Sequence, residues 1–354
     1  MELSKLQKEI LAHDEDVLFV EASAAAGKTA VLTARARDEL AKKKGTVVLF
    51  TFTRAAAEEM RKRTCATWAD DVFIGTIHSY CLSLLLSKGI TEANNYCEEE
   101  QFDKLFSLIQ KHPECIRPVY CVLCDEAQDC DKDQFNFIFD MIRAQRYFLV
   151  FDKRQSIYRW RGSEPELLDE YAEKLDATIC SLNENYRNAS EILQYAQSII
   201  EAAGVSYYDR SVPMRQGGQV IIVAYSAAAI AKTIKRRGHY KDWFVLTRTN
   251  QQLEDFAESL RQFGVPYATF KRSDLNGDEL AEKMEEDSVK LLTIHASKGL
   301  EAKNVVVIGA RFYNTEEKCI DYVAATRAKD LLVWTEMPNN SYKKARRQIE
   351  NWED

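Results

Sequence analysis

Residues 20–32, VEASAAAGKTAVL, have the types and order of a phosphate-binding loop. Gly27, Lys28 and Thr29 supply the G-K-[ST] end of that motif, and Ala22 stands where its first glycine would be. Backbone N–H groups at a helix N-terminus bind phosphate oxygens, the lysine reaches the β- and γ-phosphates, and the threonine hydroxyl ligates Mg²⁺. Small side chains let the backbone approach the ligand, although alanine restricts positive φ. The predicted ligands are therefore ATP and Mg²⁺, held by Ala22, Ser23, Ala24, Ala25, Ala26, Gly27, Lys28 and Thr29.

The second half of an ATPase site should consist of acidic residues at the end of a buried strand. The stretch VLCDEAQD places Asp125 and Glu126 directly after an apolar run. Asp125 would hold Mg²⁺ together with Thr29, and Glu126 would polarise the attacking water. An isolated Asp-Glu pair also fits a solvated strand end. Its position behind a G-K-T loop favours the catalytic interpretation.

Apolar strand-like runs alternate with helical patterns along the whole chain, which predicts an α/β fold with parallel sheets covered by helices. Nine strands fit two sheets better than one. We place the domain boundary near 178–182, which gives domains 1–180 and 181–354. The predicted strands are 17–22, 46–53, 120–126, 147–152, 220–225, 243–249, 289–295, 304–309 and 331–336.

The composition excludes a membrane-spanning protein and predicts a cytoplasmic one. The chain has 354 residues, of which 46% are hydrophobic and 29% charged, and it contains no run of about 18 apolar residues. Its N-terminus lacks the apolar segment of a signal peptide. The net charge of −7 argues against a uniformly basic surface, but a local basic groove could still bind nucleic acid.

The nine cysteines are an odd number, which suits reduced thiols. Cys121 and Cys124 form a C-x-x-C, with Cys115 and Cys130 on either side. A metal or iron–sulfur site is one interpretation of this group. We favour buried core residues, because VYCVLC is a short apolar run and cysteine is among the most buried residue types.

From these motifs onward the sequence resembles the UvrD/Rep-like superfamily 1 helicases, nearly end to end and in the order of the family's motifs. The most specific stretch is FDKRQSIYRWRG, which resembles the family's QSIYxWRG coupling motif. The resemblance implies that Gln155 senses the γ-phosphate and that Arg161 links DNA to the nucleotide. LSKLQ resembles the Q motif, in which Gln7 reads adenine; Ser4 and Gln7 equally fit a helix capping box.

The resemblance also implies a set of DNA contacts and a second set of nucleotide contacts. It identifies LNENYRNASEIL and YVAATRAKDLLVW as motifs that contain two arginine fingers, Arg187 and Arg327, the second positioned by Thr326. Tyr186 would stack on adenine, and Gly299 and Glu301 would lie toward the nucleotide. The implied DNA contacts are Phe52, Thr53, Arg54, Thr76, His78, Tyr158, Trp160, Arg161, His295 and Lys298.

The chain departs from the family pattern in its two accessory insertions. The first, at about 85–118, is short enough for only two small helices, and the second is reduced to a polar stretch before Val289. The G-K-T is followed by Ala30, where many relatives carry a basic residue. Lys153 and Arg154 replace a more acidic run, and the sequence alone assigns them no role.

Together these features predict two RecA-like P-loop domains in tandem with an ATP cleft between them. The implied function is a DNA helicase or translocase acting on single-stranded DNA or a single-strand/duplex junction, with 3′ to 5′ polarity. Three alternatives stay open: a partner-dependent subunit that unwinds weakly alone, an ATP-switched scaffold, and a P-loop NTPase or kinase unrelated to DNA. A protein partner would replace the missing accessory domain. One chain holds both halves of the ATP site, so a monomer would suffice.

Overall fold

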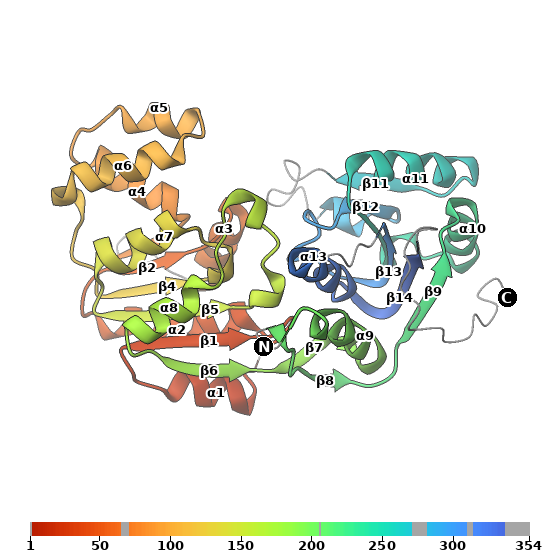
Figure 1. The fold of residues 1–354 in the computed structure, drawn as a ribbon, viewed down its shortest axis with the longest axis horizontal. Coiled ribbons are helices and arrows are strands. Elements are labelled where there is room, and N and C mark those ends of the chain that lie inside the picture. Colours follow the sequence, from red (N-terminus) through yellow and green to blue (C-terminus); the bar gives the residue numbers. More distant parts are fainter. Residues whose placement is uncertain (1, 65–70, 205–206, 271–281, 310–313, 337–354) are drawn as a thin grey trace. The chain divides into compact units, whose positions relative to one another are not determined.

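A computed structural model describes residues 2–64, 71–204, 207–270, 282–309 and 314–336 (Figure 1). These residues form two compact units that meet in sequence between Leu182 and Asn183. The short segment Ser23–Ala25 groups with the second unit, although it lies within the sequence of the first. None of the helices in the described ranges is long and apolar enough to span a membrane.

The first unit is built on a six-stranded sheet in which every neighbouring pair of strands is parallel. Parallel strands must be joined by crossovers, and helices make most of these connections. In spatial order the strands are β3 (Val72–Gly75), β2 (Val47–Phe50), β4 (Cys121–Cys124), β5 (Arg146–Phe151), β1 (Val17–Ala22) and β6 (Thr178–Leu182).

Both faces of this sheet are buried, because successive side chains of a strand point to opposite sides. Leu18 and Val20 of β1 belong to one apolar cluster, whereas Phe19 belongs to the other. The first cluster is completed by α1 (Lys5–Ala12), α2 (Lys28–Lys42) and α3 (Arg54–Thr64). The second is completed by α4 (Ile77–Leu86), α6 (Phe102–Lys111), α7 (Lys132–Asn136) with the π-helical Phe137–Ile142, and α8 (Leu167–Lys174).

The interval 85–118 contains the short helix α5 (Ala93–Glu98) and α6. Figure 1 shows both beside α4, and α6 contacts both of its neighbours. Leu105 and Ile109 of α6 are fully buried in the same cluster as the sheet residues. The short insertion therefore extends the core of the first unit.

The second unit has its own six-stranded parallel sheet. Its strands are, in spatial order, β11 (Tyr267–Phe270), β12 (Val289–Thr293), β10 (Trp243–Thr247), β13 (Ala302–Ile308), β14 (Ala328–Glu336) and β9 (Gln219–Ala224). A separate parallel pair consists of β7 (Glu184–Ala189) and β8 (Val212–Arg215). The helices are α9 (Ser190–Glu201), α10 (Ala227–Arg237), α11 (Asn250–Gln262) and α13 (Thr315–Ala325).

The predicted α/β class with parallel sheets in tandem is confirmed, and each of the nine predicted strands is present. Five strands were not predicted. Of these, β3 and β11 have only four residues each, and β6 alternates exposed with half-buried positions. β7 has the polar sequence ENYRNA, which carries no apolar run to signal a strand. Most of the reduced second interval, residues 271–281, lies outside the described residues.

The cysteines near β4 are core residues, as predicted. Cys115, Cys121, Cys124 and Cys130 are all buried. Cys121 and Cys124 belong to apolar clusters on opposite faces of the sheet, so the C-x-x-C cannot close on one metal ion. Burial raises the pKa of the Cys121 thiol to about 12, which keeps it protonated. Among the described residues, no group of three or more His, Cys, Asp or Glu side chains is arranged to hold a metal ion.

Candidate nucleotide site and nucleic-acid interface

The strand order of the first sheet brings three predicted site segments to one edge. β5 lies between β1 and β4, with Leu149 opposite both Phe19 and Cys124. Because the strands are parallel, their carboxyl ends meet at the same edge, which is where ligands bind in open α/β sheets. The loop after β1, the acids after β4 and Gln155 after β5 therefore lie around a common point, with Gln155 following the middle strand.

The loop after β1 uses positive φ at two positions. Gly27 has a φ of 85° and is the N-cap of α2, where no side chain caps the helix. This φ favours glycine, and a Cβ built on Gly27 would come within 2.5 Å of the Gln7 amide nitrogen, so the Gln7 side chain would have to shift. Ala25 has a φ of 57°, a left-handed conformation that costs an L-residue roughly 1–2 kcal/mol. The glycine-poor loop thus carries backbone strain at Ala25.

The Gln7 side chain forms a hydrogen bond with the phosphate loop. Its amide Nε2 donates to the Ala26 carbonyl over 3.0 Å, while Oε1 accepts from the Ser4 backbone N–H over 3.0 Å. The Ser4 hydroxyl in turn accepts from the Gln7 backbone, which completes the capping box of α1. Both ends of the Gln7 amide thus have partners within the protein, and the capping box that the sequence offered is formed; the contact with adenine stays a prediction.

Lys28 and Thr29 open the 15-residue helix α2. The Lys28 side chain is buried, with Nζ 3.4 Å from the Ala22 carbonyl at the end of β1. The uncapped N-terminus leaves its N–H groups to a ligand, and the helix dipole favours an anion there. The arrangement fits a nucleotide phosphate, because amine, hydroxyl and N–H groups all come from one turn of the chain.

The acids after β4 are joined to the middle strand by a chain of hydrogen bonds. Asp125 is buried, and its Oδ1 accepts from the Glu126 backbone N–H over 3.0 Å. Glu126 has a φ of 50°, and its carboxylate accepts from the side-chain amide of Gln128. The other end of the Gln128 amide accepts from the Asp152 backbone N–H over 2.9 Å. The loop after β4 is thereby fixed to the end of β5.

The chain of hydrogen bonds from Glu126 through Gln128 to Asp152 continues to Gln155, and we call this series the relay. The Asp152 carboxylate is 0% exposed, and its Oδ2 accepts from Gln155 Nε2 over 2.7 Å. Gln155 is itself buried, so its amide is held in one orientation by this bond. A side chain proposed to sense a phosphate is positioned here by a buried carboxylate.

Three residues of the phosphate loop bond to residues that follow Leu182. Asn185 Nδ2 donates to the Ala24 carbonyl over 3.0 Å, and the Tyr186 backbone N–H donates to the Ala25 carbonyl over 3.3 Å. The Ser23 hydroxyl donates to Asp209 over 3.3 Å. These bonds account for the grouping of Ser23–Ala25 with the second unit, and they hold the backbone on both sides of the strained φ.

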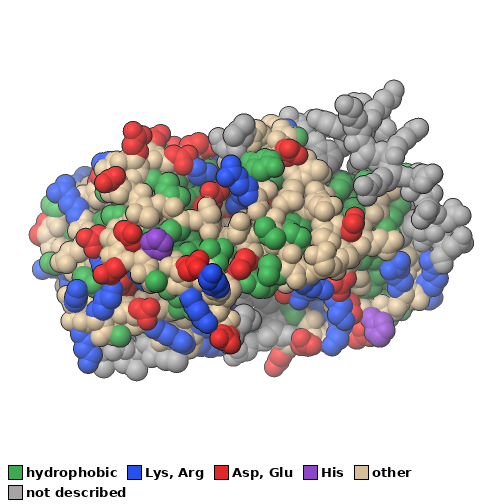
Figure 2. All heavy atoms as spheres, turned by 90° about the horizontal axis from the view of Figure 1, so that it is seen from below, with side chains coloured by type: hydrophobic (Ala, Val, Ile, Leu, Met, Phe, Trp, Pro, Cys, Tyr) green, Lys and Arg blue, Asp and Glu red, His purple; other side chains and the backbone are tan. Residues whose placement is uncertain are grey.

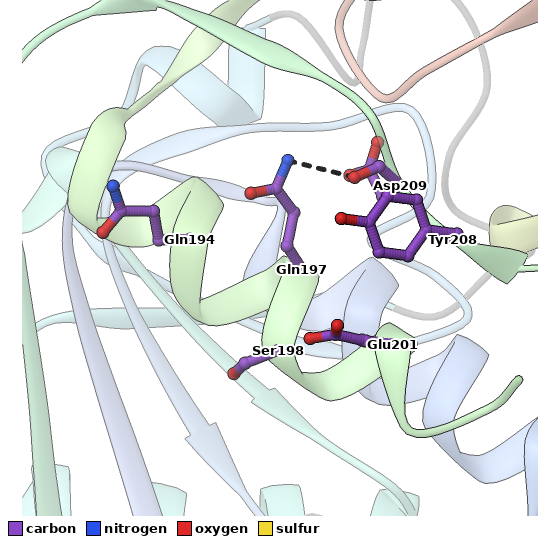
Figure 3. Close-up of a pocket in the computed structure, with 6 residues that line it drawn as sticks. All are labelled: Gln194, Gln197, Ser198, Glu201, Tyr208 and Asp209. Atoms are coloured by element: carbon purple, nitrogen blue, oxygen red, sulfur yellow. Dashed lines mark hydrogen bonds between the residues drawn. The ribbon is translucent and has the colours of Figure 1, made fainter. Parts of the chain in front are cut away.

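Asp209 borders a polar pocket of about 190 Å³ beside α9 (Figure 3). Gln197 points toward it and donates to the backbone carbonyls of Asp209 and Ser211, over 3.3 and 2.9 Å. The Asp209 carboxylate also accepts from the Tyr322 hydroxyl of α13 over 2.9 Å. Asp209 therefore ties together the loop, α9 and α13. The pocket is lined by Gln194, Gln197, Ser198, Glu201, Tyr208 and Asp209.

The aromatic residues proposed for DNA divide into buried and exposed rings. The rings of Phe52 and Tyr158 stack with centroids 5.0 Å apart and an interplanar angle of 17°. Tyr158 is buried, so it supports Phe52 and presents little of its own ring to a base. Trp160 is 66% exposed, with the Arg161 guanidinium 5.5 Å from its ring centroid. Arg54 is exposed on the first turn of α3.

Thr53 and Thr76 are helix caps in this structure. The Thr53 hydroxyl accepts from the Ala56 N–H over 3.1 Å, and the Thr76 hydroxyl accepts from the Ser79 N–H over 3.2 Å. Capping satisfies amides that a helix start leaves without a partner. The predicted DNA contact by Thr76 would have to coexist with this cap, a role that sequence spacing did not reveal.

His78 packs against the short insertion. Its ring stacks on Phe102 of α6 with centroids 4.0 Å apart, and Gln134 Nε2 lies 3.4 Å from its Nε2. Burial, with a smaller effect of the Arg161 charge, lowers the pKa of His78 to about 4. The imidazole is therefore neutral near pH 7, which argues against a cationic contact with phosphate.

Arg187 and Glu301 form an ion pair in the second unit. Arg187 Nε donates to the Glu301 carboxylate, and its NH1 donates to the Thr326 carbonyl over 3.2 Å. Lys329 lies 2.6 Å from the other Glu301 oxygen. Burial alone would raise the pKa of Glu301, but the charges and hydrogen bonds of Arg187 and Lys329 outweigh it and give a pKa of about 2. Tyr186 is exposed, and its hydroxyl donates to Glu184 over 2.8 Å.

Arg327 is 1% exposed and follows α13 by two residues. Its guanidinium donates to the carbonyls of Val323 and Leu300, over 2.9 and 3.3 Å, and to the Thr326 hydroxyl over 3.1 Å. The interaction expected with Thr326 is present. An arginine-finger role would require the Arg327 guanidinium to leave these acceptors.

The other predicted residues of this unit lie in the turn that follows β12. His295 and Lys298 are half-buried, and the Lys298 N–H donates to the His295 carbonyl over 3.5 Å. Gly299 has a φ of 89°, and a Cβ at this position would meet only open space, so its requirement is conformational.

Charges are mixed on the face drawn in Figure 2, where acidic and basic side chains of the described residues are interspersed. A nucleic acid on this face would be held by particular residues rather than by a uniformly basic surface.

The sequence matches two family profiles in tandem. The UvrD/REP helicase N-terminal domain matches residues 3–114 and 114–176, and the UvrD-like helicase C-terminal domain matches residues 180–276 and 270–338. The chain belongs to the UvrD/Rep-like helicases.

Named relatives agree with this membership. The chain is 24% identical to the ATP-dependent DNA helicase PcrA of Bacillus subtilis, over 75% of this chain and 50% of PcrA. It is 28% identical to the ATP-dependent DNA helicase Rep of Escherichia coli, over 41% of this chain and 24% of Rep. It is 26% identical to the Gabija protein GajB of Bacillus cereus, over 54% of this chain and 48% of GajB. The matched part is thus half or less of each of these relatives.

Several residues of this UvrD/Rep-like site gave no usable signal in the sequence. Asp152 and Asn185 are polar residues in or beside known motifs, but their bonds to Gln155 and Ala24 depend on the fold. Asp209 lies in a segment without a motif. Arg154 was conspicuous by its charge, yet only the structure shows that its guanidinium is buried beside Asp152.

The strain at Ala25 predicts opposite effects of glycine at two neighbouring positions. Ala25→Gly should raise the stability of the protein by about 0.5–1 kcal/mol, because glycine adopts positive φ without the Cβ clash. Ala26→Gly is the control: Ala26 is buried and is not among the positive-φ residues, so the change should destabilise by a similar amount. Urea unfolding midpoints measure both, and equal loss of stability in the two variants would contradict the assignment.

The half-buried His78 predicts a pH dependence of stability. Its folded pKa of about 4 lies below the ordinary value of 6.5, so the unfolded chain takes up the proton first. The free energy of unfolding therefore has its full value above pH 6.5, where His78 is neutral in both states. It falls as the pH decreases from 6.5 toward 4, because the unfolded state gains a proton that the folded state does not. NMR titration should show His78 neutral at pH 5.5, and Phe102→Ala should raise its pKa toward 6.5. A wild-type His78 pKa near 6.5 would exclude this packing.

Proposed function

We propose that this chain is an ATP-dependent motor that translocates along single-stranded DNA, with the 3′ to 5′ polarity that its family resemblance implies. The observation that carries the proposal is the convergence at one sheet edge of the Gly27 loop, the Asp125–Glu126 acids and Gln155. The hydrogen-bond relay from Glu126 to Gln155 supports it further, because a site that couples binding to hydrolysis needs these groups held together.

In the first unit, Lys28 and the N–H groups that open α2 would bind the β- and γ-phosphates, and Thr29 and Asp125 would hold Mg²⁺. Bound MgATP supplies the γ-phosphoryl group that water attacks, with the metal neutralising its charge. Glu126 would orient that water and accept its proton, and Gln155 would contact the γ-phosphate. Loop positions 22–26 would contribute backbone N–H groups to the phosphates.

In the second unit, Arg187 and Arg327 would stabilise the charge that develops during transfer, an effect worth roughly 10³–10⁵ in rate for an arginine finger. Arg187 would exchange its Glu301 partner for phosphate oxygens. Glu301 and Gly299 would line the nucleotide, with Tyr186 on adenine. Gln7 of the first unit would contact the adenine.

DNA would be held by stacking and by separate polar contacts. Phe52, supported by Tyr158, and the exposed Trp160 offer aromatic faces, each worth roughly 1–3 kcal/mol per base with little sequence preference. Arg54, Arg161 and Lys298 would supply positive charge. Thr53, Thr76, His78 and His295 complete the proposed set.

We further propose that a protein partner supplies the duplex contacts that the small first insertion cannot provide. The interval between α4 and β4 holds two short helices, α5 and α6, whose buried residues belong to the core of the first unit, so it adds no separately folded domain for duplex contacts. The motor itself would act as a monomer.

Steady-state ATPase assays test the motor. Single-stranded DNA should stimulate ATP hydrolysis strongly, Lys28→Ala should abolish it, and Glu126→Gln should lower turnover by roughly 100-fold or more while nucleotide binding persists. An ATPase rate that is low with DNA and equal to that of Lys28→Ala would reject an autonomous motor and favour the ATP-switched scaffold.

Translocation and unwinding can be separated in one preparation. The purified chain should displace streptavidin from the end of a biotinylated single strand but open a duplex of about 40 base pairs slowly, because the duplex contacts are missing. Efficient unwinding of that duplex by the chain alone would reject the partner hypothesis and leave the motor proposal intact.

A further inference from the structure

Lys153 and Arg154 are adjacent basic residues after β5, and their side chains diverge. Lys153 pairs with the exposed carboxylate of Asp169 on α8. Arg154 turns inward and is buried, with Nε donating to Asp152 Oδ1 over 2.5 Å. Its NH2 lies 3.6 Å from Glu21 Oε1 near the end of β1. The second of the two basic residues thus lies between the strand of the phosphate loop and the strand of Gln155.

Asp152 needs such a partner. Its carboxylate is 0% exposed and has lost its hydration, and a buried charge is costly unless it is paired and hydrogen-bonded. The Arg154 guanidinium stays charged and occupies Oδ1. This leaves Oδ2 to accept from Gln155 Nε2, at 2.7 Å.

The orientation of Gln155 depends on that acceptor. Its amide carries two N–H donors and one carbonyl acceptor, and one donor is used on Asp152. The remaining donor and the carbonyl are then fixed relative to the sheet edge. Without the Arg154 guanidinium on Oδ1, the Asp152 carboxylate would lose a charged donor that holds it in place, and the acceptor that orients the Gln155 amide would no longer be fixed.

We propose that Arg154 is a positioning residue for Gln155, acting through the Asp152 carboxylate, and that it sets how well the site distinguishes a nucleoside triphosphate from a diphosphate. The inference rests on the proposed ATP site. In this proposal Arg154 acts through Asp152 and Gln155 and makes no contact of its own with the nucleotide. Substitution of Arg154 should therefore change the binding and hydrolysis of nucleotides that carry a γ-phosphate, but leave ADP binding unchanged.

The experiment compares Arg154→Met with Arg154→Lys, which keeps the charge, and with Lys153→Met, which removes the adjacent charge without touching Asp152. Affinities for ADP and for the non-hydrolysable analogue AMP-PNP are measured together with kcat for ATP. For Arg154→Met we expect ADP affinity within about twofold of wild type, but AMP-PNP affinity and kcat reduced roughly tenfold or more. Lys153→Met should match wild type, and Arg154→Lys should recover most of the loss.

Epistasis separates positioning from general destabilisation. In a Gln155→Ala background, Arg154→Met should lower kcat by less than about twofold, because residues that act as one unit are not additive. Multiplicative losses, or equal losses of ADP and AMP-PNP affinity, would overturn the proposal. If Arg154→Met fails to fold, Arg154→Gln takes its place in every comparison.

Failure of the inference and failure of the proposed function give different results. Suppose that the wild-type chain binds both nucleotides and that Arg154→Met has the same ratio of AMP-PNP to ADP affinity as wild type. This result rejects the role of Arg154 and leaves the ATP site intact. A wild-type chain that binds neither nucleotide rejects the ATP site and the inference with it.

Discussion

The parallel arrangement of the first sheet is the constraint on which the candidate site depends. Parallel strands end at one edge, so whichever segments follow β1, β5 and β4 must lie next to one another there. The register places Leu149 of the middle strand opposite Phe19 and Cys124, so the three strands end nearly level. Burial of both sheet faces fixes that register, because a one-residue slip would exchange the side chains of the two apolar clusters.

A buried polar relay converts this proximity into a defined geometry. Gln128 and Asp152 contact no predicted ligand, yet they join the loop after β4 to the end of β5. Both are fully buried, where an unpaired polar group would be costly and a paired one is rigid. Glu301 is exposed rather than buried, and the charges and hydrogen bonds of Arg187 and Lys329 keep it ionised. In both units, residues around the proposed catalytic groups restrict where those groups can point.

The glycine-poor loop depends on the same kind of support. A loop of small residues can adopt the conformation of a phosphate loop if hydrogen bonds from other segments hold its strained residue. Ala25 takes a left-handed φ, and the carbonyls of Ala24 and Ala25 accept bonds from Asn185 and Tyr186. Glycine is retained at position 27, where a side chain would meet Gln7. Strain at one alanine is therefore offset by hydrogen bonds from residues far away in sequence.

The sequence by itself determined the α/β class, the nine longer strands and the motifs that identify the UvrD/Rep-like family, because apolar periodicity and short motifs are local properties. It also indicated the core role of the cysteines at 121 and 124. Only the tertiary structure decided the strand order, the polar strand β7 and the inward turn of Arg154. It confirmed the capping box of Ser4 and Gln7 that the sequence offered, and only it showed that Thr76 acts as a cap and that His78 packs on an insertion helix. These depend on partners distant in sequence and on burial, which no local pattern specifies.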